Sequence, residues 1–159
     1  MEHKIEIVEY KMEYQPDFER LNRYWIETFF WLEDIDIYVL QHPEEAILDK
    51  GGYIFMALCD GEVAGTVALK KVDNGIYEFT KMAVDPAFQR RGIAEKLSHF
   101  AIETAQHAGA GSIILYSQTG LGPAIALYKK LGFEEVPLEP GTYQRADIKM
   151  EKILSPVYH

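Results

Sequence analysis

Apolar and polar positions along the chain follow two different periods, which separate predicted helices from predicted strands. Between Pro16 and Leu32 the apolar side chains recur at three- and four-residue steps, as they do in an amphipathic helix. From Tyr53 to Val84 the pattern becomes β-rich, and Asp60-Gly61 is a strong hairpin signal. The predicted strands are residues 4–10, 53–59, 62–71, 76–84, 112–117, 133–136 and 143–153, and the predicted helices are 16–32, 34–40, 43–50, 92–108 and 123–131.

The order of these elements indicates an α/β domain. A strand, a long helix and another strand follow each other between residues 76 and 117, which implies a parallel pair with a right-handed crossover inside a mixed sheet. In such sheets ligands bind at the carboxyl end of the strand before the crossover, which here is Val84. We find no repeat or linker that divides the chain, so residues 1–159 are expected to form a single domain.

The charge of the chain narrows the classes of partner. There are 16 Lys and Arg residues against 25 Asp and Glu residues, which gives a formal net charge of −9. A chain with this charge repels nucleic acid and anionic membrane surfaces, so a general nucleic-acid binder is not expected. It favours cationic partners such as amines, although in most acidic proteins the negative charge serves only solubility.

The single cysteine and the N-terminal segment indicate a compartment. Cys59 lies in the apolar run IFMALC, where a buried core thiol is a simpler interpretation than a catalytic one. The N-terminal segment MEHKIEIVEY has no apolar block as long as that of a signal peptide, and no stretch approaches the ~20 apolar residues of a membrane span. We therefore expect a soluble, cytoplasmic protein without a membrane partner.

Residues 89–94, QRRGIA, stand directly after a predicted strand and directly before a long predicted helix. The free N–H groups and the dipole of a helix N-terminus attract anions, and Gly92 and Ala94 leave room for a phosphate. Arg90 and Arg91 add positive charge within an acidic protein. On these six residues alone, a basic helix-capping loop without a ligand explains the pattern equally well.

Motifs of other enzyme classes are missing from the sequence. There is no G-x-x-x-x-G-K-[ST] or G-x-G-x-x-G loop for a nucleotide and no G-x-S-x-G elbow for a serine hydrolase. The five histidines show neither H-x-x-x-H nor H-E-x-x-H spacing, so no metal site is predicted.

Two segments together resemble the GNAT family of acyl-CoA-dependent N-acetyltransferases. Residues 89–94 are similar to that family's [RQ]-x-x-G-x-[GA] pyrophosphate loop, and residues 124–133, AIALYKKLGF, are similar to its second motif, A-x-x-L-Y-x-x-x-G-F. The order of the predicted elements is also that of the family. The resemblance implies the GNAT (acyl-CoA N-acyltransferase) fold, an α/β fold with a mixed, mostly antiparallel sheet of about seven strands flanked by helices.

The same resemblance implies acetyl-CoA as co-substrate. Backbone groups near the end of the strand 76–84 would contact its pantetheine arm and acetyl carbonyl, and the loop that follows would hold its diphosphate. Gln118 is a longer amide where family members often carry asparagine, and Lys129 or Lys130 would reach the adenosine phosphate or simply be solvated. The cofactor-binding residues implied in this way are Met82, Ala83, Val84, Gln89, Arg90, Arg91, Gly92, Ile93, Ala94, Gln118 and Tyr128.

The resemblance also implies the two residues that move protons. Tyr128 would act as the general acid that protonates the departing thiolate, although its spacing alone fits a half-buried aromatic residue. Glu78 would accept a proton from the amine through water, although other family members use ordered water alone. Strand alternation predicts that Glu78 shares one face with Thr80, Met82 and Val84.

The acceptor site is expected between the N-terminal helices and the last hairpin. Aromatic residues and acids between Tyr24 and Asp36 would suit a cation, but the helical spacing of the rings favours a core role for most of them. Residues 143–147, YQRAD, form a second candidate rim. In that rim Arg145 would hold a substrate carboxylate or, as the simpler interpretation, pair with a surface acid.

The function predicted from the sequence is transfer of an acetyl group from acetyl-CoA to a primary amine. The acceptor would be a small-molecule amine or an amine of a peptide or protein, and the family suggests a homodimer through the final strands. Two other functions are compatible with the sequence. They are a non-catalytic CoA-binding or sensory module on the same fold, and an interaction protein whose acidic surface docks a basic partner.

Overall fold

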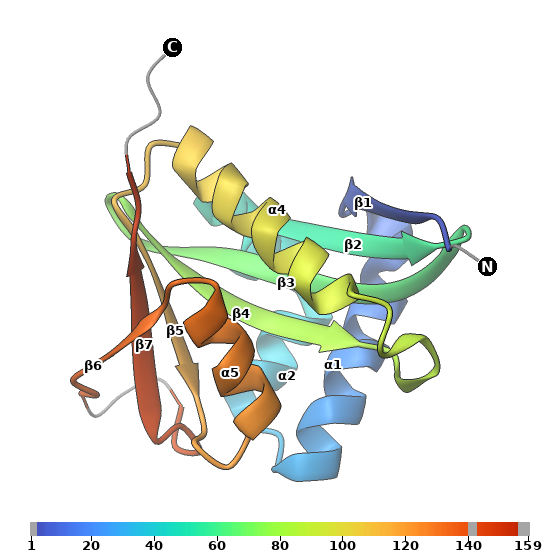
Figure 1. Cartoon of the computed structure of the whole chain (residues 1–159). Coiled ribbons are helices and arrows are strands. Elements are labelled where there is room, and N and C mark those ends of the chain that lie inside the picture. Colours follow the sequence, from blue (N-terminus) through green and yellow to red (C-terminus); the bar gives the residue numbers. More distant parts are fainter. Residues whose placement is uncertain (1–2, 140–142, 156–159) are drawn as a thin grey trace.

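A computed structural model of the chain describes residues 3–139 and 143–155, which form a seven-stranded sheet with helices on both faces (Figure 1). The strands are β1 (Ile5–Glu9), β2 (Tyr53–Cys59), β3 (Glu62–Asp73), β4 (Ile76–Val84), β5 (Ser112–Ser117), β6 (Glu134–Val136) and β7 (Ile148–Ile153). The α-helices are α1 (Gln15–Phe29), α2 (Asp34–Gln41), α3 (Pro43–Ala46), α4 (Ile93–His107) and α5 (Gly122–Lys130). In the two described ranges, none of the helices combines the length and the apolar character that crossing a membrane requires.

The strand order is β1-β2-β3-β4-β5-β7-β6, and the predicted mixed sheet is confirmed. β4 and β5 pair in parallel, and the remaining neighbours pair antiparallel. The crossover from β4 to β5 passes through α4, as the order of apolar periods predicts. β7 follows β6 along the chain but lies between β5 and β6 in the sheet.

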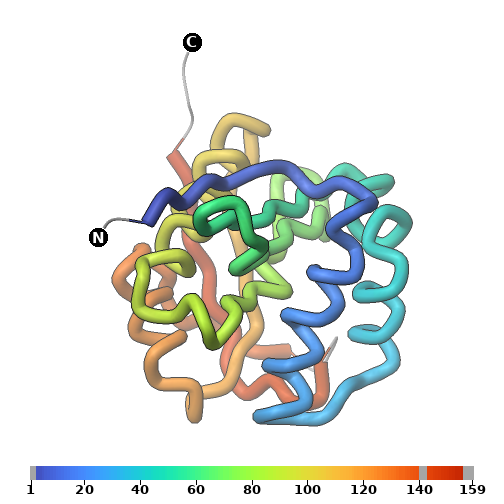
Figure 2. Tube along the Cα trace, turned by 90° about the vertical axis from the view of Figure 1, so that its right-hand side faces the viewer, coloured from blue at the N-terminus to red at the C-terminus, as the bar shows by residue number. Residues whose placement is uncertain are grey.

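The core has two parts, one on each face of the sheet. In Figure 2 the orange helix α5 lies on one side of the strands, and the blue and cyan helices α1 and α2 lie on the other. The part under α4 and α5 includes Phe55, Cys59, Val67, Leu69, Phe79, Leu97 and Leu115. The part under α1 to α3 includes Phe18, Leu40, Ile47, Ile54, Met56 and Ala68.

β4 contains a bulge close to its end. Thr80 pairs with Ala68 of β3 and Ala83 pairs with Thr66, so residues 81 and 82 of β4 stand opposite the single residue 67. Lys81 adopts φ of 53°, which is uncommon for a residue other than glycine. The extra residue reverses the alternation of side chains between the two faces.

The predicted common face for Glu78, Thr80, Met82 and Val84 is therefore wrong. Met82 and Val84 pack against the α4 and α5 part of the core, on the same side as Phe79. Glu78 points to the other face, where its carboxylate accepts a hydrogen bond from Tyr143. The cause is the bulge at Lys81, which no local period in the sequence reveals.

Two element ends also differ from the predictions. The helix predicted to reach Leu32 ends at Phe29, because Phe30 is already extended with φ of −144°. The strand predicted from Tyr143 starts only at Ile148. The segment before it is held by side chains instead of a strand ladder, since the Asp147 carboxylate accepts hydrogen bonds from the amide and hydroxyl of Thr119, each at 2.8 Å.

Candidate functional site

β4 and β5 are paired over only three residues and then diverge (Figure 1). The last pair joins Glu78 to Ile114, while β4 continues to Val84. We call the region where the two strands separate the fork. It lies at the carboxyl end of β4, where the sequence predicts the ligand site.

The backbone groups of two residues at the end of β4, Met82 and Val84, face the fork. The Asp85 amide donates to the Ala64 carbonyl of β3 at 2.8 Å, so alternation turns the amides and carbonyls of Met82 and Val84 to the opposite side, toward the fork. The indole N–H of Trp25 donates to the Val84 carbonyl at 2.8 Å. The Val84 carbonyl, one of the backbone groups predicted to contact the cofactor, is therefore already bonded to Trp25 of α1. The backbone groups of Met82 and the amide of Val84 are the predicted groups that stay available.

The loop after β4 places the start of α4 directly beside the fork. Arg90 and Gly92 both have positive φ, of 65° and 75°, and Gly92 is the N-cap of α4. The Lys96 amide makes the first bond back to the Gly92 carbonyl, so the amides of residues 93–95 precede the helical ladder. A Cβ built at Gly92 would meet no atom within 4 Å, which leaves open space over these amides.

The N-terminus of α4 is seated tightly on β3. A Cβ at Gly65 of β3 would lie 3.1 Å from the Ala83 carbonyl oxygen and from Ile93, and 3.2 Å from Leu97. The glycine thus permits a close approach of the helix that a side chain would block. This contact fixes the direction in which the first turn of α4 points.

The two arginines of the loop have different surroundings. Arg91 donates to the Cys59 sulfur at 3.4 Å and lies over the Phe88 ring, so its guanidinium is tied to the body of the protein. Gln89 and Arg90 are exposed. Arg90 is therefore the better placed of the two predicted cations to meet an anion in solution. The predicted burial of Cys59 is confirmed.

Tyr128 of α5 reaches the α4 and α5 face of β4. Its ring packs edge-on against Phe79 at 5.9 Å and Phe133 at 6.1 Å between centroids. Burial raises the pKa of Tyr128 to about 12, so the phenol keeps its proton at neutral pH. Within the described ranges, no protein group is hydrogen-bonded to this hydroxyl, which leaves it available as a donor.

Glu78 lies at the base of the fork on the opposite face. Its side chain is buried, and the Tyr143 hydroxyl donates to its Oε2 at 3.0 Å. Burial raises the pKa of Glu78 above its ordinary value, and the Tyr143 hydrogen bond and the charges of Lys70 and Lys81 offset only part of that increase. A carboxylate with a raised pKa binds a proton more readily near neutral pH. Glu78 and Tyr128 thus approach the same stretch of β4 from its two faces.

A buried ionic cluster adjoins Glu78, and sequence reasoning missed it. Asp36 is fully buried, and its carboxylate contacts Lys81 Nζ at 2.7 Å and Arg145 at 2.6 and 2.9 Å. Arg145 also pairs with Glu33 at 2.7 Å. The predicted surface ion pair of Arg145 is therefore wrong, because its partners lie in a largely buried cluster. The signal was Lys81 itself, a charge within the apolar run FTKMAV.

Several aromatic rings predicted as core are exposed instead. Tyr24, Phe29 and Trp31 are 48%, 51% and 55% exposed, and Phe29 stacks on Trp25 with 5.2 Å between centroids. The buried stripe of α1 is made by other residues, so the Tyr24 and Phe29 rings fall on its flank, and Trp31 lies beyond the end of the helix. Nearby, a cavity of about 400 Å³ is lined by Trp31, Leu32, Glu33, Asp34, Ile35 and Gln144. The end of the first candidate acceptor rim, which was predicted between Tyr24 and Asp36, thus meets Gln144 of the second rim, 143–147, at one place.

Two of the other side chains predicted to contact the cofactor, Gln118 and Lys130, have partners within the protein. The Gln118 side-chain amide donates to the Arg145 carbonyl, which directs it toward the acceptor rim. Lys130 pairs with Glu95 in the first turn of α4 at 3.0 Å, while Lys129 is exposed. The Lys130–Glu95 pair connects α5 to α4 on the surface.

One group of potential metal ligands occurs in the described part of the chain. The ligand atoms of His3, Cys59 and Asp60 lie within 4.8 Å of one another. His3 and Asp60 are hydrogen-bonded to each other at 3.0 Å, and the Arg91 guanidinium contacts the Cys59 sulfur. The positive charge of the Arg91 guanidinium beside the Cys59 sulfur disfavours the binding of a metal cation there.

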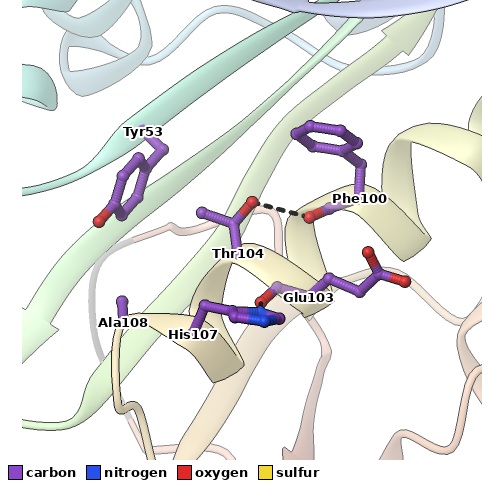
Figure 3. A pocket seen from close by; sticks show the side chains of 6 residues that line it. All are labelled: Tyr53, Phe100, Glu103, Thr104, His107 and Ala108. Atoms are coloured by element: carbon purple, nitrogen blue, oxygen red, sulfur yellow. Dashed lines mark hydrogen bonds between the residues drawn. The ribbon is translucent and has the colours of Figure 1, made fainter. Parts of the chain in front are cut away.

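A second cavity, of about 340 Å³, lies between Tyr53 at the start of β2 and the last turns of α4 (Figure 3). The Thr104 hydroxyl donates to the Phe100 carbonyl at 2.9 Å, and the His107 ring contacts the Glu103 carbonyl at 2.8 Å. These polar groups are thus directed to the helix backbone. The cavity lies at the end of α4 opposite the loop of residues 89–92.

Comparisons with known proteins agree on one family. The model of the Acetyltransferase (GNAT) family matches residues 9–133. A relative described as an uncharacterized N-acetyltransferase, YjgM of Escherichia coli strain K12, is 33% identical over 97 residues, which are 59% of this chain and 58% of that protein. The chain spans about half the length of the curated relatives that it matches.

Solved structures share the fold over nearly the whole chain. A GNAT-family acetyltransferase from Staphylococcus aureus Mu50 superposes with a TM-score of 0.86 at 22% identity, covering 96% of this chain and 100% of that one. The PaiA N-acetyltransferase of Thermoplasma acidophilum, solved in complex with coenzyme A, gives a TM-score of 0.74 at 18% identity, covering 95% and 99%. With the family model matching most of the chain, we conclude that this protein belongs to the Acetyltransferase (GNAT) family.

Proposed function

We propose that the protein transfers the acetyl group of acetyl-CoA to a primary amine. The observation that carries this proposal is the placement of Glu78 and Tyr128 on opposite faces of β4 at the fork, beside the open N-terminus of α4. An acid and a base on either side of one strand suit a reaction in which one proton leaves the nucleophile and another reaches the leaving group.

The residues around the fork suit acetyl-CoA by their chemistry. The amides at the start of α4, the open space at Gly92 and the charge of Arg90 fit a diphosphate. The unpaired edge of β4 at Met82 and Val84 offers amide donors to the pantetheine arm and to the acetyl carbonyl oxygen. A coenzyme A complex of a protein with the same fold supports this assignment.

In the proposed reaction, Glu78 takes a proton from the acceptor ammonium through water, since a lysine-like amine is protonated at neutral pH with a pKa near ~10.4. The amine nitrogen attacks the thioester carbonyl carbon while backbone amides of β4 stabilise the negative charge that develops on its oxygen. The carbon–sulfur bond then breaks, and Tyr128 gives its phenolic proton to the departing thiolate. The second proton of the attacking nitrogen leaves through water and restores the Tyr128 phenol. The amide product and coenzyme A leave.

The acceptor is proposed only as a class, a primary amine of a small molecule, a peptide or a protein. A panel of such amines, with release of coenzyme A detected by a thiol reagent, tests the proposal. We expect turnover with at least one amine and a loss of about 100-fold or more in Glu78→Gln. Binding of acetyl-CoA without coenzyme A release for any amine would instead identify a CoA-binding module without catalysis.

A further inference from the structure

Tyr143 occupies a position between the base and two cations, the buried Lys81 and the partly buried Arg145. Its hydroxyl donates to Glu78 Oε2 at 3.0 Å, and its ring centroid lies 5.1 Å from Lys81 Nζ and 5.2 Å from the Arg145 guanidinium carbon. Burial raises the pKa of Tyr143, and the negative charge of Glu78 raises it further, so the phenol stays protonated and can only donate to the carboxylate. One side chain thus connects Glu78 to the ionic cluster.

The cluster holds the segment of Tyr143 in place from two distant parts of the chain, the start of α2 and the β4 bulge. The carboxylate of Asp36 in α2 accepts hydrogen bonds from two guanidinium nitrogens of Arg145. It also pairs with Nζ of Lys81 in the β4 bulge. The Gln144 amide donates to Glu33 Oε1 at 3.0 Å, so both residues that follow Tyr143 are bonded to the start of α2. A two-point arginine–carboxylate contact fixes direction as well as distance. The segment that carries Tyr143 is therefore anchored immediately beside it.

Glu78 is a further carboxylate beside a cluster whose own charges are balanced, and Lys70, its partner on β3, places a positive charge near it. Lys81 and Arg145 balance Asp36 and Glu33 within the cluster. The other groups that face Glu78 are Lys70 across β3, Thr80 on its own strand, and the Tyr116 phenol of β5, which bonds to Glu139. When Glu78 is ionised, the Tyr143 hydroxyl is the donor that meets the added charge directly.

We propose that Tyr143 is a positioning residue for Glu78, whose carboxylate it orients and holds in the ionised form that accepts the amine proton, and that Asp36, Lys81 and Arg145 hold Tyr143 for this task. The inference rests on the proposed function, in which Glu78 is the base. It adds two features to that function. The pH below which activity falls is determined by Tyr143, in the segment before β7. This segment is coupled to α2 through Arg145.

The test compares Tyr143→Phe with the wild type. Removing a donor to a carboxylate destabilises the ionised form, so the acidic limb of kcat/KM against pH should move to higher pH by about one unit, with the KM for acetyl-CoA unchanged. Tyr10→Phe is the matched control. It also loses a tyrosine-to-glutamate hydrogen bond, to Glu44 at 2.5 Å, but lies away from the fork, and its limb should not move. An unmoved limb in Tyr143→Phe overturns the inference.

Two further measurements separate this inference from the proposed function. Carbon-13 NMR titration of the Glu78 carboxyl, assigned with Glu78→Gln, reports its protonation without turnover, and its midpoint should rise in Tyr143→Phe. Arg145→Lys keeps the charge but loses the two-point contact, and should move the midpoint in the same direction by less. If Glu78→Gln keeps the wild-type profile, the base assignment fails. If Glu78→Gln is inactive but the midpoint is the same in Tyr143→Phe, only the role of Tyr143 fails.

Discussion

Replacing Asp36 by Asn removes one buried charge while keeping nearly the same shape. In the native protein the Asp36 carboxylate is fully buried and neutralises Lys81, whose side chain is only 4% exposed. Arg145 keeps Glu33 as a partner in the variant, but Lys81 loses its own. The substitution therefore leaves the Lys81 ammonium group in the protein interior without its ion-pair partner.

The expected loss is large for one substitution. Breaking a buried ion pair by removing one partner costs about 3–5 kcal/mol of the free energy of unfolding. The pKa values give a second view of the same interaction. Burial alone would raise the pKa of Asp36, but Arg145 and Lys81 lower it from 3.8 to about 2. At about 1.36 kcal/mol per pKa unit, this accounts for about 2 kcal/mol that the wild type should lose as the pH falls from about 5 toward 2, and the variant should not.

On the alkaline side, the stability of Asp36→Asn depends on the pKa of Lys81. Burial lowers the pKa of Lys81, and Asp36 offsets part of that effect. In Asp36→Asn the folded protein therefore releases the Lys81 proton at a lower pH than the unfolded chain, whose lysines titrate near ~10.4. Since the unfolded chain then binds more protons, stability should recover as the pH rises from 7 toward 10.

Urea unfolding followed by tryptophan fluorescence measures the loss at pH 7, the recovery at pH 10 and, in a series from pH 5 down to pH 2, the acid-side loss of the wild type. Asp34→Asn is the matched control, because Asp34 is an exposed acid on the same helix, and its loss should stay below about 0.5 kcal/mol. A loss below about 1 kcal/mol in Asp36→Asn at pH 7 would refute the reasoning. An equal loss at both pH values would show that Lys81 is not the destabilising group.

Three other substitutions test the site and its support. Tyr128→Phe should lower kcat by about 100-fold or more with an unchanged Kd for acetyl-CoA measured by calorimetry, because the phenol acts only on the leaving group; an unchanged kcat would remove Tyr128 from the mechanism. Gly92→Ala forces alanine to φ of 75° and should cost about 1–2 kcal/mol in urea unfolding, and its methyl group should raise the KM for acetyl-CoA by entering the open space at the α4 start. Gly65→Val should cost about 1–3 kcal/mol in the same assay, because its Cβ would already lie 3.1 Å from a backbone oxygen, whereas an unchanged midpoint would mean that α4 moves freely on β3.

The order of the helices and strands could be predicted because most of them, or the turns between them, carry a local pattern in the sequence. The apolar steps of α1 and α4, the Asp60-Gly61 turn and the loop at residues 89–94 are local patterns, and the sheet confirms the order that they predict. The bulge in β4 has no such pattern. It depends on the pairing of β4 with β3, and the change of face at Lys81 follows from that pairing.

The ionic cluster was out of reach for a different reason. A lysine within the run FTKMAV signals a charge that needs a partner, but the chain offers 25 acidic residues as candidates. Only the fold selects Asp36, which lies 45 positions away along the chain. The exposed rings of α1 could not be predicted because helical spacing shows that one side of a helix is apolar, not how far that helix overlaps the sheet.

The insertion of β7 between β5 and β6 has a consequence for synthesis on the ribosome. The nascent chain emerges from its N-terminus, so β5 and β6 leave the exit tunnel before the strand that will join them. Until then one edge of β5 is unpaired, and an open strand edge is a template for association with other chains. A message truncated after β6 would yield a product with this edge exposed, and such products are expected to depend on chaperones or to be degraded.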